Sequence, residues 1–219
     1  MEILKFLLCV VLGFLLSGIW FGLHFAFVML MQKTKTLWLS HLNAVLASII
    51  PIVLITITMG IYPIQASGIK SIKVYIVVIL TVLITSIIIT LKKIKSKKGK
   101  DLFLWGLDGM LMEIPQRLMM QSFVYGILKL FGVGSLNLYT IISTAFIWCI
   151  SIEMQAILSR KPFDKEVLID ILASFIFSIG IGYAYQQTGL IVITMLAHFC
   201  ERILSCYISD KKVKNIGNI

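Results

Sequence analysis

The sequence predicts an all-α protein, a polytopic bundle of about seven transmembrane helices. Of its 219 residues, 59% are hydrophobic and only 14% are charged. The mean hydropathy is +0.99. A soluble domain does not need so much apolar surface to fill its core, so the excess is expected to face lipid.

Several apolar stretches exceed the roughly 18 to 20 residues that a helix needs to cross a bilayer core of about 30 Å. The stretch at 102–131 fits either one long tilted helix or a helix followed by a re-entrant turn. The first stretch is longer than a signal-peptide core and lacks a small-residue cleavage pattern, so we expect a retained helix. The expected segments are about 3–31, 38–59, 74–91, 102–131, 136–158, 166–185 and 189–208.

The basic residues predict the orientation of these segments. The net charge is +10, but most lysines and arginines lie in short loops or tails that about seven crossings place on one side. The positive-inside rule makes that side cytoplasmic. We therefore expect a multi-pass protein of the cell membrane with a cytoplasmic C-terminus and no nucleic-acid partner. The clusters are Lys33 and Lys35; the lysine-rich run 92–100, which would also contact anionic lipid; Arg160, Lys161 and Lys165; and Lys211, Lys212 and Lys214.

The chain is expected to form one integral membrane domain over 1–219, with two halves of different character. Residues 1–91 form almost purely aliphatic helices with ionisable residues near their ends. Ionisable residues occur within the apolar segments of 102–208. Any chemistry is therefore expected in the second half.

Glu113 and Arg117 are the first pair of charges inside an apolar segment. A charged side chain at the centre of a membrane helix costs at least about 2.5 kcal/mol, so such residues usually pair, line a cavity or act in function. The two residues lie one helical turn apart on one face, which also fits a purely structural ion pair. Pro115 between them lacks a backbone donor and is expected to kink or widen the helix.

A second group of polar residues lies in the last segment. Glu201 and Arg202 follow His198 by three and four residues, so the imidazole and a carboxylate share one helix face. Alternatively, Glu201 and Arg202 pair with each other or extend to the interface. Glu153, near the cytoplasmic end of the 136–158 segment, would serve either the site or the interface.

The order of these residues resembles the CPBP family of intramembrane proteases, also called the CAAX protease and bacteriocin-processing or Abi family. The family pattern is Glu-Glu-x-x-x-Arg, then Phe-x-x-x-His, then His-x-x-x-Asn or a similar small residue, on separate helices. In this chain Glu113-x-x-x-Arg117, a helix core beginning at Phe146, and the run ending Leu-Ala-His198 follow that order. The resemblance covers roughly 105–206.

The chain departs from the family pattern at three positions. Met112 stands where the family has its first glutamate, so Glu113 alone would serve that role. Ile150 stands at the position of the second-motif histidine, and isoleucine neither binds metal nor transfers protons. Arg202 stands at the position of the third-motif asparagine.

Two nearby acids would compensate for the missing groups. Glu153 lies three residues beyond Ile150, on nearly the same helix face, and would direct a carboxylate toward the place of the missing imidazole. Glu201 would add another oxygen donor beside His198. A site of Glu113, Glu153, His198 and Glu201 would either bind a divalent metal such as zinc or activate water directly.

The resemblance implies an intramembrane endopeptidase that cleaves membrane-associated peptides or protein precursors. Glu113 would act as general base on water, His198 would stabilise the oxyanion or assist proton transfer, and Arg117 would orient Glu113. The missing histidine favours a second hypothesis, an inactive relative that serves as an immunity protein or a membrane chaperone. A small transporter ranks third, because no broken-helix pair or repeat is visible.

Overall fold

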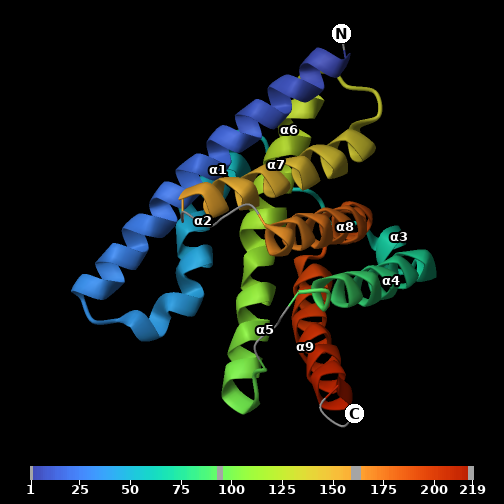
Figure 1. The fold of residues 1–219 in the computed structure, drawn as a ribbon. Helices are drawn as coiled ribbons and strands as arrows, with labels where there is room; N and C mark the ends of the chain where they lie inside the picture. Colours follow the sequence, from blue (N-terminus) through green and yellow to red (C-terminus); the bar gives the residue numbers. More distant parts are fainter. Residues whose placement is uncertain (1, 93–95, 159–163, 217–219) are drawn as a thin grey trace.

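The computed structural model describes residues 2–92, 96–158 and 164–216, and every regular element in these ranges is helical. This confirms the predicted all-α class (Figure 1). In chain order the elements are α1 (Glu2–Lys33), the 3-10 helix η1 (Leu37–Leu42), α2 (Asn43–Thr58), α3 (Ala66–Ile69), α4 (Ile72–Ile89), α5 (Gly99–Glu113), the π-helix η2 (Ile114–Gln121), α6 (Ser122–Leu130), α7 (Leu136–Leu158), α8 (Lys165–Thr188) and α9 (Ile191–Ile216).

In the described ranges, six helical stretches are long and apolar enough to cross a membrane. The remaining expected segment, 102–131, is a helical path without an intervening loop, formed by α5, η2 and α6 in succession. The change to π-helix in its middle leaves each piece shorter than a full crossing. The six stretches are Glu2–Lys33, Leu39–Thr58, Ile72–Ile89, Leu136–Met154, Lys165–Thr188 and Ile191–Lys211.

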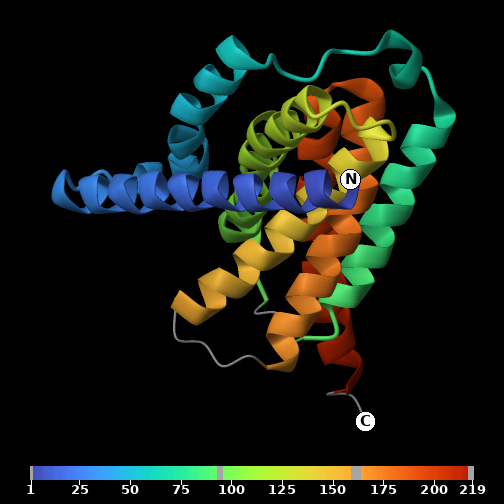
Figure 2. The ribbon, with the colours of Figure 1, turned by 90° about the horizontal axis from the view of Figure 1, so that it is seen from above.

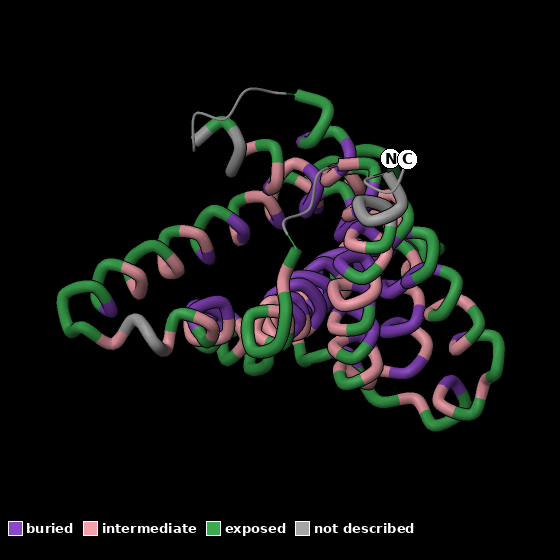
Figure 3. Tube along the Cα trace, turned by 60° about the horizontal axis from the view of Figure 1, so that its bottom comes forward, coloured by how far each residue is buried: buried purple, intermediate pink, exposed green. Residues whose placement is uncertain are grey.

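The bundle buries polar side chains together with its apolar core, and many large apolar side chains lie exposed on its outside. On α4, Thr81, Thr85 and Ser86 are buried, whereas Ile79 and Leu83 are 58% and 44% exposed. The buried threonine hydroxyls donate to backbone carbonyls one turn earlier at 2.7 Å, so they need no water. Figure 3 shows the buried positions gathered where helices meet. This arrangement suits a lipid surrounding, in which polar groups must be satisfied within the protein.

Helix α8 packs against α4 on one side and α7 on the other, and α9 packs against α5 and α4. Small residues allow these close approaches. A Cβ at Gly180 of α8 would lie 1.9 Å from Thr81 Oγ1 of α4. A Cβ at Gly106 of α5 would lie 2.7 Å from the Phe199 ring of α9. These approaches bring residues of α5, η2, α8 and α9 together in the second half of the chain, 102–208.

Several of the described helix ends lie in two groups. Figure 2 shows the end of α4, the end of α7, the start of α8 and the end of α9 at one end of the bundle, with the α2–α3 connection at the other. Lys92, Lys97, Lys98 and Lys165 belong to the first group of segments. We call this end of the molecule the basic end.

We expect the basic end to face the cytoplasm, because lysine-rich loops are retained there during insertion. A reporter fused after Lys214, and one inserted within 92–100, should both give a cytoplasmic signal. A reporter inserted after Gly60 or Gly132 should give the opposite signal. A periplasmic or extracellular signal from either basic-end fusion would contradict the orientation.

Candidate functional site

The centre of the site is the turn of helix that joins α5 to η2. Glu113 is the last residue of α5, and Pro115 follows at the start of the π-helix. Proline lacks the backbone donor that an α-helix requires, and the chain widens into a π-helix instead of breaking. The hydroxyl of Ser122 donates to the Arg117 carbonyl, five residues earlier, at 3.4 Å.

The Glu113 carboxylate is enclosed between two cationic or donating groups. Arg117 Nε donates to Glu113 Oε2 at 3.0 Å. His198 Nδ1 lies 2.7 Å from Glu113 Oε1. With Glu113 ionised beside Arg117, the proton in this second contact lies on His198 Nδ1. Glu113 and Arg117 are both 0% exposed.

A chain of amide side chains continues from Arg117 into α8 and α7. Arg117 Nη1 donates to Gln121 Oε1 at 3.1 Å. Gln121 Nε2 donates to the Gly182 carbonyl at 2.9 Å and to Gln186 Oε1 at 2.8 Å. Gln186 Nε2 donates to Asn137 Oδ1 at 3.1 Å. Arg117 Nη2 has no partner in the described part of the chain. This buried network fixes α8 and α7 against η2.

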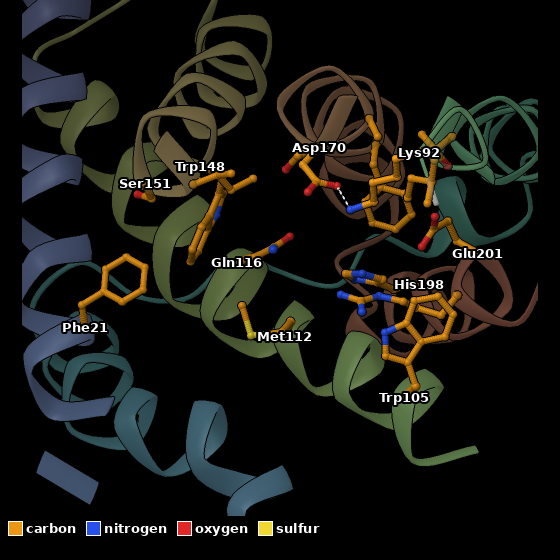
Figure 4. Close-up of a pocket in the computed structure, with 17 residues that line it drawn as sticks. Phe21, Lys92, Trp105, Met112, Gln116, Trp148, Ser151, Asp170, His198 and Glu201 are labelled. Atoms are coloured by element: carbon orange, nitrogen blue, oxygen red, sulfur yellow. Dashed lines mark hydrogen bonds and ion pairs between the residues drawn. The ribbon is translucent and has the colours of Figure 1, made fainter. Parts of the chain in front are cut away.

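A cavity of about 500 Å³ lies beside this network. Figure 4 shows Asp170, Lys92, Glu201, His198 and Trp105 on one side of it, and Phe21, Trp148 and Ser151 on the other. One wall is therefore charged and the opposite wall is largely aromatic. Lys92 follows α4 and Asp170 lies near the start of α8, so the cavity occupies the half of the bundle toward the basic end.

Helix α5 and the π-helix present Met112 and Gln116 to this cavity. Glu113 is not on the wall, since its side chain lies on the other side of the same turn and both its oxygens are engaged. His198 is the residue of the pair that lines the cavity. The expected general base is thus separated from the cavity by the imidazole.

The structure does not bring Glu153 to the cavity. Ser151 and Ile152 of α7 line it, and the Ser151 hydroxyl is 2.7 Å from that of Ser17 on α1. Glu153 is exposed on the outer side of α7, because successive helical residues point about 100° apart. Ile150 is half-buried and also does not line the cavity. The expected replacement of the missing histidine is therefore not assembled.

Glu201 and Arg202 both line the cavity but make no ion pair with each other. Glu201 is 2% exposed, and its Oε1 atom has no partner among the described residues. The Arg202 guanidinium lies over the Trp105 ring, 5.1 Å from its centroid. Lys92 is paired with Asp170 across the same wall.

The expected metal set does not fit this arrangement. Within 2–92, 96–158 and 164–216, no group of three or more His, Cys, Asp or Glu side chains is placed to hold a metal ion. Of the four expected ligands, Glu113 contacts only protein donors, Glu153 lies outside the cavity, and His198 commits Nδ1 to Glu113.

Several site residues were missed at the level of sequence. The amides Gln121, Gln186 and Asn137 carry no charge and are common in polar loops. Gln121 lies one helical turn beyond Arg117, and that spacing is the signal that would have identified it. Asp170 is an acid inside an expected span, so the rule that singled out Glu113 would also have selected it. Lys92 was counted only as an orientation signal.

Comparison with known proteins gives no function for this site. Searches of protein-family models, of curated proteins and of solved structures found no match to this chain.

Proposed function

We propose that this protein binds part of a membrane-associated peptide in its cavity without cleaving it. The observation that supports this function is that Glu113 has no access to the cavity. Its two carboxylate oxygens contact Arg117 and His198, and Met112 lines the cavity wall instead. A general base must reach the proton it removes, directly or through one water. Glu113 reaches only protein donors.

The departures from the CPBP pattern support the same conclusion. Met112, at the position of the first glutamate, faces the cavity with an apolar side chain. Ile150, at the position of the second-motif histidine, lies outside it. The resemblance thus supports the version of the hypothesis in which an inactive relative serves as an immunity protein or a membrane chaperone. A cavity of this volume is in the usual range for ligand sites.

One observation favours hydrolysis as a second candidate function. His198 lines the cavity while Nδ1 donates to a buried carboxylate, which is the arrangement of an oriented histidine base. His198 Nε2 would remove a proton from a water molecule as its oxygen attacks the peptide carbonyl. The amide nitrogen would leave with that proton. This scheme gives Glu113 the role of positioning His198.

Binding is tested with a photo-reactive residue on the cavity wall. The probe is a short leucine–alanine peptide with one central lysine, acetylated and amidated at its ends, added to protein in lipid nanodiscs. Benzoylphenylalanine in place of Phe21, a cavity residue, should cross-link the probe. Filling the cavity with Ala173→Trp should abolish this product, whereas Ala26→Trp, on the exposed side of α1, should not. The proposal would be contradicted if the probe did not cross-link, or if Ala173→Trp left the cross-linked product unchanged.

Cleavage is measured in the same samples by mass spectrometry. We expect the probe peptide to be recovered intact, since the Glu113 carboxylate does not reach the cavity. Turnover that falls at least about 100-fold in His198→Ala would instead establish the second candidate, because general-base catalysis contributes on that order. Glu153→Gln is the matched control, since this carboxylate is exposed outside the cavity.

A further inference from the structure

Glu201 is a buried acid on the cavity wall for which the described chain supplies no partner. Its side chain is 2% exposed and its Oε1 atom accepts no hydrogen bond. The two other acids of this region are engaged, Asp170 by Lys92 and Glu113 by Arg117 and His198. An unpaired carboxylate is costly in a membrane interior, so it marks a functional position.

Among the described residues, no neighbouring cation forms an ion pair with Glu201. Arg202 is the next residue, but it points about 100° away along the helix and lies over the Trp105 ring at 5.1 Å. Lys92 is directed to Asp170 (Figure 4). The polar wall of the cavity therefore offers one carboxylate without a direct contact to a cation, beside the Arg202 guanidinium that lies over Trp105.

His198 adds a second acceptor beside this carboxylate. It precedes Glu201 by three residues on α9, so both side chains lie on the same helix face. In the neutral tautomer whose Nδ1–H donates to Glu113, 2.7 Å away, the Nε2 atom carries the lone pair. Nε2 has no hydrogen bond within the described residues. The Glu201 carboxylate and His198 Nε2 are thus two acceptors on the charged wall without a hydrogen-bond donor from the described residues.

We propose that Glu201, with His198 Nε2 as a second acceptor, receives a cationic group of the bound peptide, a lysine ammonium or an arginine guanidinium. This proposal rests on the proposed peptide-binding function and names the side-chain chemistry that the cavity selects. An ammonium has several N–H donors and no acceptor, so it matches both groups. The apolar stem of the lysine would lie along the aromatic side of the cavity.

The test compares two peptides that differ in one charge. The probe with a central lysine is titrated against the same peptide with norleucine, which keeps the stem and removes the ammonium. We expect wild-type protein in nanodiscs to bind the lysine peptide at least about tenfold more tightly, because hydrogen bonds to charged groups are worth that much. Glu201→Gln should reduce this preference to about one and leave norleucine affinity unchanged.

Two further variants control the comparison. Glu166→Gln removes an exposed carboxylate near the same end of the bundle and should keep the full preference. Glu201→Asp keeps the charge but shortens its reach, so it should lower the lysine preference only in part. Glu201→Gln also removes an unmatched buried charge, and we therefore expect its thermal midpoint without peptide to rise.

The outcomes separate this proposal from the proposed function. In one outcome, wild-type protein binds both peptides equally, and Ala173→Trp still blocks cross-linking at position 21. That outcome would overturn the role of Glu201 and leave the proposed peptide binding intact. A lysine preference that persists in Glu201→Gln would also overturn it. Binding of neither peptide would overturn both.

Discussion

Replacing Glu113 by glutamine should lower the free energy of unfolding by about 3 to 5 kcal/mol, the cost of breaking a buried ion pair from one side. The substitution leaves the guanidinium of Arg117, which is 0% exposed, without a carboxylate. Arginine does not lose its proton in proteins, so this charge cannot be neutralised. Equilibrium unfolding in mixed micelles measures the change.

Replacing Arg117, the other member of the ion pair, should lower the free energy of unfolding by less. Arg117→Met leaves Glu113 in contact with His198, and a carboxylic acid or a protonated imidazole relieves the remaining charge. The double variant Glu113→Gln/Arg117→Met should lose less stability than the two single changes added together. Glu153→Gln, at an exposed position, should leave stability unchanged. A Glu113→Gln variant as stable as Glu153→Gln would contradict the assigned role of the pair.

This prediction bears on how Glu113 is interpreted in function. From sequence, Glu113 was expected to act as a general base, so its loss would stop catalysis and leave the fold intact. The structure instead places Glu113 between Arg117 and His198. Loss of function in Glu113→Gln is therefore not proof of catalysis, and the amount of folded protein has to be measured beside any activity.

Much of the fold was predictable because the length and apolarity of a segment are enough to identify a membrane helix. The expected segment 38–59 corresponds to the span Leu39–Thr58, and 74–91 to Ile72–Ile89. The segment 102–131 was the exception, since periodicity does not reveal a π-helix in the middle of a helical path. Only Pro115 indicated a local change there.

The site was less predictable, because spacing places residues on one face of a helix but does not say which faces of different helices meet. The resemblance drew attention to Glu113 and His198, and the structure places these two residues 2.7 Å apart across 85 positions of sequence. Glu153 does not line the cavity, and neither does Ile150, the residue from which its helix face was inferred. Asp170 also lines the cavity, but it stands outside the three family motifs, so the resemblance gave no reason to place it there.

Gly109→Ala is expected to disrupt the contact between α5 and α9 on which the site depends. A Cβ at this position would lie 2.8 Å from His198 Cδ2 and 2.8 Å from Arg202 Cγ. Neither atom is the free end of a flexible side chain, and the His198 ring is also fixed by Glu113. The ring must shift, so we expect a loss of about 1 to 3 kcal/mol of stability, typical of overpacking.

The same shift should weaken binding of the lysine peptide in the cavity, because His198 lies on the cavity wall, one turn from Glu201. We expect Gly109→Ala to lower affinity for the lysine peptide and reduce its advantage over the norleucine peptide. Gly22→Ala is the matched control, since no atom lies within 4 Å of a Cβ there. Alanine is the better helix former, so this control should be neutral or slightly stabilising. If Gly109→Ala matched Gly22→Ala in stability and in peptide preference, the close approach of α5 to α9 would not be what holds His198 in place.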